Sequence, residues 1–180
     1  MAVNQMAGKQ SIEFHEAPHI ISCASVAGPK EGQGPLGEWF DLVAPEAEFG
    51  EDTWEKAEST MQKEALETAV GKARLSMWQI RYLFGGDLLA QLTATFFGNE
   101  ESNVPLFGLY GACSTCGESL TLAAMTVAAG YADYAAALTS SHFGSAEKEF
   151  RFPLGYGNQR PLSASWTVTG SGAFVLAPKG

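Results

Sequence analysis

The stretch from Val104 to Ala129, VPLFGLYGACSTCGESLTLAAMTVAA, constrains the fold more than any other part of the chain. Its apolar run, Val104–Tyr110, predicts a buried β-strand. At Gly111 the pattern changes abruptly to helical spacing, with apolar side chains at Leu120, Ala123, Ala124 and Val127. The turn between strand and helix carries Cys113.

A cysteine in this turn has two interpretations. Unpaired backbone N–H groups and the positive end of the helix dipole would face the sulfur of Cys113 and favour the nucleophilic thiolate. A free cysteine, however, is also among the most buried residue types and often acts as a small hydrophobe. Position alone leaves both interpretations open.

Composition excludes several classes of protein. With 180 residues, 46% hydrophobic and 17% charged residues, the chain suits one globular domain. A net charge of −9 disfavours nucleic acid and anionic lipid as partners. No apolar run approaches the roughly 20 residues of a membrane span, and the N-terminus lacks the apolar region of a signal peptide. We therefore expect a cytosolic chain, or one peripheral to a membrane.

Strand and helix patterns alternate along the chain. The expected strands are His19–Gly28, Ile80–Gly85, Val104–Tyr110, Tyr134–Ser141 and Trp166–Ala177. The expected helices are Thr53–Ala73, Leu88–Phe97 and the one that follows Cys113 and ends at Gly130. This order predicts an α/β fold with a mostly parallel five-stranded sheet and helices on both faces. The last strand lacks a helical crossover and is free to run antiparallel.

Local signals refine this pattern. Asp52 with Glu55 resembles a capping box, and Asp87 is a candidate cap for the second helix. The outer face of the first helix, including Glu58, is expected to be solvated. Residues 1–17 form an arm or edge strand, the segment 39–49 is ambiguous and contains a candidate helical turn, and the Gly-Ser-Gly at 170–172 suggests a β-bulge.

The segment from His142 to Ser165 has little regular pattern but many functional side chains. Long loops inside compact domains are usually functional or disordered, and the aromatic residues Phe143, Phe150, Phe152 and Tyr156 argue against disorder. Three of the few basic residues gather there: Lys148, Arg151 and Arg160. These cations either bind an anion or pair with the neighbouring Glu147 and Glu149 on a solvated surface.

The turn at Cys113 resembles that of the thiolase-like superfamily. Ketoacyl synthases of this superfamily carry an ACxTG-type turn at the nucleophile; Ala112 to Thr115 match it, and Cys116 replaces the glycine. Six blocks between Ala27 and Val175 resemble more closely one family of sporulation proteins within the superfamily. These blocks are AGPKEGQGPLG, GDLL, LYGACSTC, TSSH, EFRFP and TVTGSGA.

The resemblance implies a binding protein rather than an enzyme. It implies that residues 1–180 form one thiolase-like N-terminal half domain, with the second half, which supplies catalytic histidines or asparagine in the superfamily, absent. It further implies binding of dipicolinate (pyridine-2,6-dicarboxylate), with or without calcium, and a role in its uptake into the developing spore. Expected partners are other proteins of that uptake system and a second copy or second half. The implied location is peripheral, on the cytoplasmic side of the spore inner membrane.

The expected ligand contacts combine the turn with the basic loop. A flat dicarboxylate needs a stacking surface and cationic or N–H donors, and the beginning of the helix at Ser114 and Thr115 is a candidate anion site. The predicted ligand-binding residues are Cys113, Ser114, Thr115, His142, Lys148, Arg151, Phe152, Tyr156 and Arg160. No metal ligands are predicted, because a structural zinc site needs four ligands and the chain has no second Cys or His pair.

Two enzymatic alternatives remain. Cys113 could serve a thiolase-type or condensing enzyme acting on acyl-thioesters, but acyl transfer needs a proton-transfer partner, and only His142 follows a strand near the turn. Cys113 and Cys116 also form a C-x-x-C pair at a strand-to-helix turn, as in thiol redox proteins.

Overall fold

The computed structural model describes residues 4–150, 163 and 165–179 and is built around a six-stranded sheet. The strand order is β4-β3-β8-β7-β5-β6. Strand β8 runs antiparallel to both of its neighbours, and all other adjacent pairs are parallel. The strands are β3 (His19–Ala27), β4 (Leu42–Val43), β5 (Tyr82–Asp87), β6 (Leu106–Gly108), β7 (Ala135–Ser141) and β8 (Gly170–Ala177). The α/β prediction and the antiparallel last strand are confirmed.

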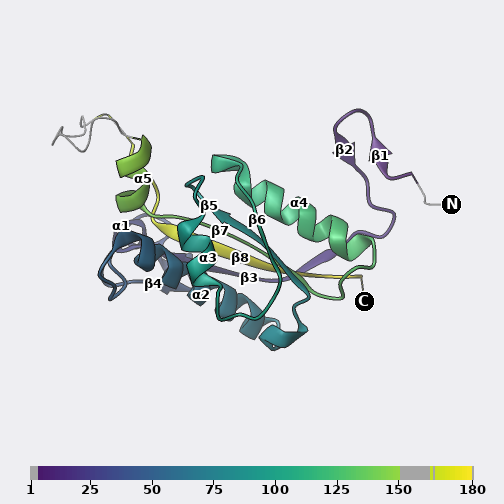
Figure 1. Cartoon of the computed structure of the whole chain (residues 1–180), viewed down its shortest axis with the longest axis horizontal. Helices are drawn as coiled ribbons and strands as arrows, with labels where there is room; N and C mark the ends of the chain where they lie inside the picture. Colours follow the sequence, from purple (N-terminus) through teal and green to yellow (C-terminus); the bar gives the residue numbers. More distant parts are fainter. Residues whose placement is uncertain (1–3, 151–162, 164, 180) are drawn as a thin grey trace.

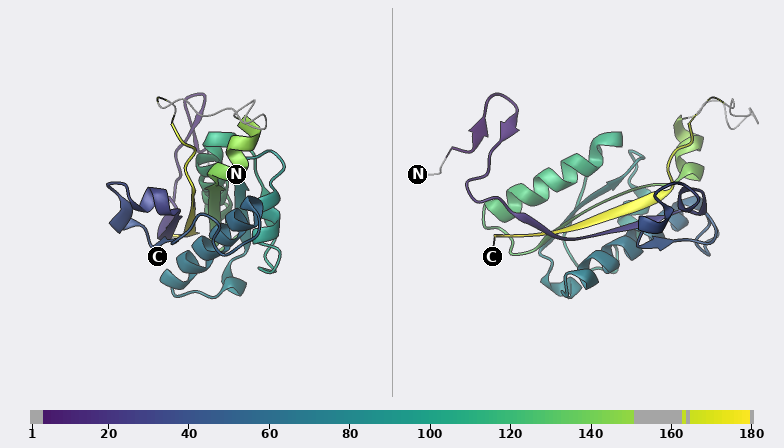
Figure 2. Two further views of the ribbon diagram at one scale, coloured as in Figure 1. Left: turned by 90° about the vertical axis from the view of Figure 1, so that its left-hand side faces the viewer. Right: turned by 180° about the vertical axis from the view of Figure 1, so that it is seen from behind.

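Two long helices cover opposite faces of the sheet. Helix α2 (Trp54–Lys72) lies on one face and α4 (Thr115–Ala128) on the other, as Figures 1 and 2 show. Shorter elements lie around the sheet, namely α1 (Pro29–Gly32), α3 (Thr93–Gly98), α5 (Phe143–Phe150) and the 3-10 turns Gly37–Trp39, Met77–Gln79 and Ala112–Ser114. The arm forms a hairpin of β1 (Met6–Ala7) and β2 (Ser11–Ile12) that projects from the sheet (Figure 1).

The core consists of two apolar layers separated by the sheet. Successive side chains of a strand point to opposite faces. In β7, Ala136 and Leu138 therefore pack with the α2 side, whereas Ala135 and Ala137 pack with the α4 side. Alanine at three of these four positions lets both helices approach the sheet closely.

Three local predictions are wrong. The segment 39–49 begins where the 3-10 turn Gly37–Trp39 ends, and instead of a helical turn it contains β4, which pairs in parallel with the end of β3 and makes the sixth strand. The cap of α2 is Thr53 rather than Asp52, since the Thr53 hydroxyl accepts from the Lys56 amide at 3.2 Å. The 170–172 segment pairs regularly on both sides, and the irregularity of the sheet lies instead in β3, between Ile20 and Ser22.

Helix α3 starts five residues later than the sequence pattern indicates. Leu92 adopts a left-handed backbone conformation (φ 54°) immediately before it, so Leu88 to Leu92 form a loop. Asp87 lies in that loop's base and is buried, with one carboxylate oxygen accepting from the Thr95 amide at 3.0 Å. Asp87 therefore accepts a hydrogen bond from an amide in the first turn of α3, but it does so from the end of β5 and is not the residue next to the helix.

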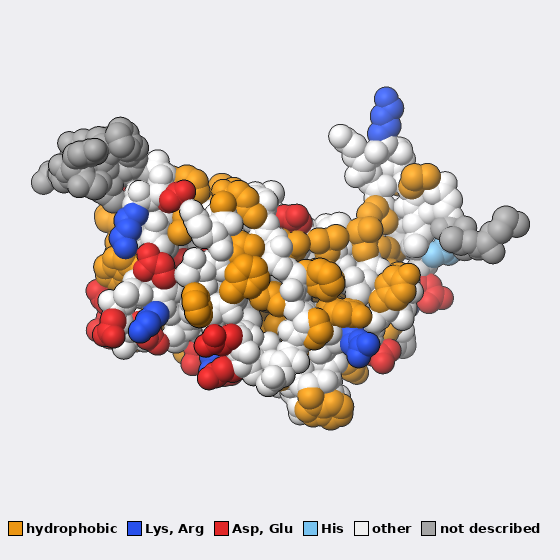
Figure 3. Space-filling model, viewed as in Figure 1, with side chains coloured by type: hydrophobic (Ala, Val, Ile, Leu, Met, Phe, Trp, Pro, Cys, Tyr) orange, Lys and Arg blue, Asp and Glu red, His pale blue; other side chains and the backbone are white. Residues whose placement is uncertain are grey.

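Several large hydrophobic side chains are exposed along one edge of the sheet. Phe96 and Phe97 of α3 and Phe107 of β6 are each at least half exposed. Figure 3 shows hydrophobic side chains gathered across the face that carries α3, β6 and α4. Because β6 is the last strand on this side, its outer edge is open to pairing with another chain.

Candidate functional site

The turn that presents Cys113 is held by its own side chains. The Ser114 hydroxyl donates to the Gly111 carbonyl at 2.7 Å, and the Thr115 hydroxyl donates to the Ala112 carbonyl at 2.9 Å. The Gly111 amide donates in turn to the Thr115 hydroxyl at 3.1 Å. Ala112 has φ 47°, a left-handed conformation that costs about 1–3 kcal/mol in a residue with a Cβ. This strained turn leaves the Cys113 thiol exposed at the beginning of α4.

A close backbone contact fixes the turn against the sheet. A Cβ on Gly86 of β5 would collide with the Leu109 carbonyl oxygen and lie 2.9 Å from a methyl carbon of Thr115. The Leu109 amide donates to the Gly85 carbonyl at 2.8 Å, which continues the β5–β6 pairing into the turn. Only glycine at position 86 allows the two backbones to approach so closely.

A groove of about 440 Å³ opens beside Cys113. It lies at the edge of the sheet where the parallel strands β5, β6 and β7 end and where β8 begins. The groove residues are Leu88, Ala112, Cys113, Thr115, Cys116, Thr139, Ser140, Ser141, Thr167, Val168, Gly170 and Gly172. They come from four of the six sequence blocks that carry the resemblance: GDLL, LYGACSTC, TSSH and TVTGSGA.

The composition of the groove suits a small anionic ligand. Hydroxyl-bearing and glycine residues predominate in its lining, and four of the hydroxyls, those of Thr115, Ser140, Ser141 and Thr167, donate to other groups of the chain. The N-terminus of α4, a helix of 14 residues, adds a partial positive charge.

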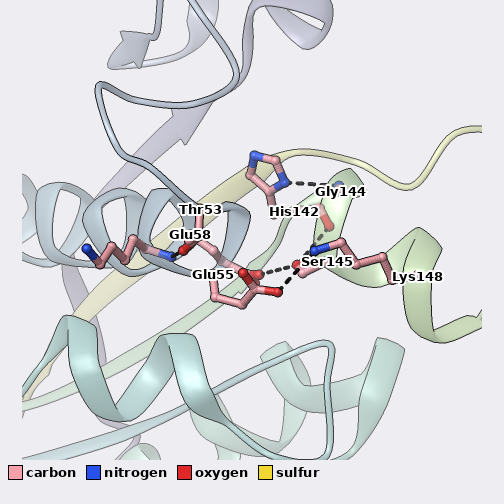
Figure 4. A network of polar contacts seen from close by, with 8 residues as sticks. Thr53, Glu55, Glu58, His142, Gly144, Ser145 and Lys148 are labelled. Carbon is pink, nitrogen blue, oxygen red and sulfur yellow. Dashed lines mark hydrogen bonds and ion pairs between the residues drawn. The ribbon is translucent and has the colours of Figure 1, made fainter. Parts of the chain in front are cut away.

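His142 does not line this groove. Its ring is fully buried between Trp54 and Phe143, with ring centroids 5.1 Å from each. Nδ1 accepts from the Gly144 amide at 3.0 Å (Figure 4), so Nε2 carries the hydrogen and donates to the Ala47 carbonyl at 2.8 Å. Burial lowers the pKa of His142. The ring is therefore held as a neutral structural link between the end of β7 and the segment before α2.

The predicted basic cluster is only partly described. Lys148 lies on α5 and pairs with Glu55 of α2 at 3.5 Å (Figure 4), in a shallow acidic hollow that is separate from the groove. The expected pairing of Lys148 with Glu147 or Glu149 is therefore replaced by a pairing between helices. The other predicted loop contacts, Arg151, Phe152, Tyr156 and Arg160, lie outside the described residues.

The structure adds groove residues that sequence reasoning did not select. Thr139, Ser141, Gly170 and Gly172 face the turn from β7 and β8. The signal was present, because these residues lie in the TSSH and TVTGSGA blocks, but only the fold brings those blocks next to Cys113.

A second, smaller cavity adjoins the groove. It measures about 170 Å³ and shares Thr167 with the groove. Its remaining lining residues are Pro29, Lys30, Glu31, Ala47, Phe143, Trp166 and Thr169. The Lys30 ammonium, from the AGPKEGQGPLG block, lies 3.9 Å from the Trp166 ring centroid, and both residues line this smaller cavity.

The described part of the chain offers neither a cluster of metal ligands nor a helix that could span a membrane. They contain no group of three or more His, Cys, Asp or Glu side chains that could hold a metal ion. No helix within the described part of the chain is long and apolar enough to cross a membrane.

Solved structures with the same fold define the class of protein. The priming β-ketosynthase of the R1128 polyketide pathway matches 96% of this chain and 53% of its own, with a TM-score of 0.59 and 15% identity. OleA H285D from Xanthomonas campestris matches 92% of this chain and 57% of its own, with a TM-score of 0.59 and 16% identity. The 3-oxoacyl-[acyl-carrier-protein] synthase III of Aquifex aeolicus VF5 matches 89% of this chain and 53% of its own, with a TM-score of 0.58 and 17% identity. The chain has a thiolase-like fold.

Sequence comparison identifies the family within that class. The family model for stage V sporulation protein AD matches residues 8–180. Stage V sporulation protein AD of Bacillus subtilis (strain 168) is 39% identical over 173 residues, which cover 96% of this chain and 51% of that protein. The chain belongs to the stage V sporulation protein AD family and spans about half the length of this relative.

Proposed function

We propose that the chain binds dipicolinate in the Cys113 groove, without transforming it, and supports its uptake into the developing spore. The observation that carries this proposal is the convergence of four separate sequence blocks on one groove. Membership of a sporulation protein family supports the biological setting.

The groove offers complementary groups for a flat dianion. The main-chain N–H groups at the N-terminus of α4 would donate hydrogen bonds to one carboxylate. The Lys30 ammonium lies over Trp166 in the smaller cavity, which shares Thr167 with the groove. We propose Lys30, Arg151 and Arg160 as cations for the ligand, with Phe152 and Tyr156 as stacking surfaces. His142 and Lys148 would act indirectly, by holding the segments around the groove.

The position of His142 argues against acyl transfer by Cys113. A general base must reach the thiol by a hydrogen bond. Both nitrogens of His142 are already engaged with main-chain groups. Redox chemistry has one observation in its favour, since Cys113 and Cys116 both line the groove. Both alternatives are outcomes of the test below.

Assembly and location follow from the same proposal. The open edge of β6, with exposed Phe96, Phe97 and Phe107, is proposed as the surface for a second copy. The uncovered outer side of α4, where Met125 is exposed, would pack on a second thiolase-like half. We propose that other dipicolinate-uptake proteins hold the chain at the cytoplasmic side of the spore inner membrane. Calcium would enter the groove with the ligand.

Calorimetric titration of dipicolinate, with and without calcium, tests the proposal. The unmodified chain should bind, and Gly172→Val should bind at least tenfold more weakly, because the new side chain fills the groove. A Cβ at Gly172 meets only one atom, 3.9 Å away, so the fold should tolerate it. Gly71→Val, in open space on α2, is the matched control and should bind normally.

Cys113→Ala separates binding from catalysis. The variant should bind dipicolinate within a few-fold of the unmodified chain, since the contacts proposed at the turn come from main-chain N–H groups rather than from the thiol. Absence of binding heat under both calcium conditions would overturn the proposal. Turnover of an acyl-thioester, or dithiol-disulfide exchange, that is abolished by Cys113→Ala would replace it with the corresponding enzyme.

A further inference from the structure

A buried carboxyl lies directly behind the groove. Glu58 of α2 is only 2% exposed, although its position in the helix pattern predicts a solvated side chain. Its Oε1 accepts from the Ser140 hydroxyl at 2.7 Å, and its Oε2 accepts from the Ser145 hydroxyl at 3.0 Å. Figure 4 shows Ser145 of α5 facing Glu58. Because Ser140 lines the groove, Glu58 is one hydrogen bond from the groove wall.

A second buried carboxyl belongs to the same chain of hydrogen bonds. Gln62 Nε2 donates to the Ser140 hydroxyl at 2.7 Å and to the Thr95 hydroxyl at 3.0 Å. The Thr95 hydroxyl donates to Asp87 Oδ2 at 2.7 Å. Asp87 is also 2% exposed. Neither Asp87 nor Glu58 belongs to any of the three ion pairs formed within the described residues.

The partners of the two carboxyls distinguish their roles. Asp87 accepts from the amides of Leu89 and Thr95, and an amide can only donate. Glu58 meets two serine hydroxyls, which can either donate or accept. A protonated Glu58 therefore keeps all of its hydrogen bonds by reversing one of them. Glu58 is the member of the pair that can hold a proton without loss of contacts.

The charges around Glu58 favour that proton. Glu55 on its own helix and Asp87 at the end of β5 are both acidic, and β7 presents only the hydroxyl of Ser140. From α5 the nearest group is Ser145, and the Lys148 cation farther along α5 is paired with Glu55. Burial, with these acidic neighbours, raises the pKa of Glu58 to about 7.

We infer that Glu58 takes up a proton when an anion occupies the groove, so that the site binds its ligand together with a proton. This inference rests on the proposed function. A negative charge near the groove wall disfavours a second one on Glu58, and binding and protonation must then favour each other to the same extent. Glu58 is a positioning residue, since it contacts the groove through Ser140.

The test is calorimetric titration of dipicolinate at pH 6, 7 and 8 in buffers of different ionisation enthalpy. Both ligand carboxyls are ionised throughout this range. If the bound charge raises the pKa of Glu58 by about one unit, about half a proton should be taken up for each ligand bound near pH 7.5. The affinity should then fall about fivefold from pH 6 to pH 8.

Glu58→Gln keeps the size and hydrogen-bonding capacity of the side chain but cannot titrate. It should bind with no proton uptake and with an affinity that does not change with pH. Glu55→Gln, on the same helix and partly exposed, should keep the proton uptake. If Glu58→Gln fails to fold, carbon-13 NMR of the unmodified chain gives the same answer, because the midpoint of the Glu58 carboxyl titration should rise when dipicolinate is added.

These experiments distinguish failure of the proton-uptake inference from failure of the proposed binding function. Binding without proton uptake, or uptake that persists in Glu58→Gln, would overturn the inference and leave the proposed function standing. Failure of dipicolinate to bind at every pH would overturn both.

Discussion

At the scale of single residues, Glu58 and His142 show how contacts distant in sequence determine what a side chain does. The sequence pattern predicts a solvated side chain for Glu58 and a position near the Cys113 turn for His142. Trp54 and Ala47, about 90 residues earlier in the chain, take His142 into the core. Ser140 and Ser145 do the same for Glu58. No local signal could have predicted these contacts.

Burial of Glu58 gives the stability of the chain a defined dependence on pH. The pKa rises from 4.5 to about 7 on folding, so between these values only the folded state keeps the proton. Stability must therefore fall as pH rises through this window, by about 3 kcal/mol in total. His142 has the opposite trend, because its lowered pKa makes stability fall as pH decreases.

Comparison with Glu58→Gln isolates the contribution of Glu58. Urea unfolding at pH 5 and pH 8 should show the unmodified chain losing about 2–3 kcal/mol relative to this variant. The His142 contribution is common to both chains and cancels. Parallel pH profiles for the two chains would show that Glu58 does not titrate in this way.

At the scale of elements, helix α2 and the strand-to-helix turn at Cys113 follow from sequence, whereas the start of α3 does not. Apolar spacing specifies the bounds of α2 within a residue or two, although the sequence pattern indicated Asp52 rather than Thr53 as its cap. The segment after Asp87 has an equally helical pattern, but the buried carboxylate of Asp87 holds the Thr95 amide and delays the helix to Thr93. Local patterns could not predict the groove, because its walls come from four segments that are far apart in the sequence and are brought together by the fold.

The close approach at Gly86 should make the turn sensitive to a single methyl group. Gly86→Ala forces the Leu109 carbonyl away from β5 and should cost more than about 2 kcal/mol of stability, together with dipicolinate binding. Gly117→Ala, in open space on α4, is the matched control and should be neutral or slightly stabilising. Urea unfolding measures both. A Gly86→Ala variant as stable as the unmodified chain would show that the backbones are not held together there.

At the scale of the whole molecule, the sheet is covered on both faces but open at the β6 edge. The exposed aromatic side chains of α3 and β6 lie along that edge (Figure 3). An open edge beside apolar side chains favours pairing with a second copy. The fold class follows from the alternation of strands and helices, but this surface appears only when α3 and β6 are placed side by side.

Sedimentation velocity tests self-association through this edge. Phe97 is 64% exposed, so Phe97→Lys should leave the fold intact and weaken association at least tenfold. Trp39→Lys changes a side chain that is 77% exposed on the 3-10 turn before β4, at the opposite edge of the sheet, and serves as the control. Equal association of both variants and the unmodified chain would place the contact elsewhere.

The most direct test of the account is to map dipicolinate on the chain by amide NMR. Titration into nitrogen-15-labelled protein should shift the amide signals of residues 112–116, 139–141 and 167–172, which line the groove. The signals of Gly71 and Lys72, at the C-terminal end of α2, should not change. Absence of shifts, or shifts confined to residues outside the groove, would contradict the claim that this site holds the ligand.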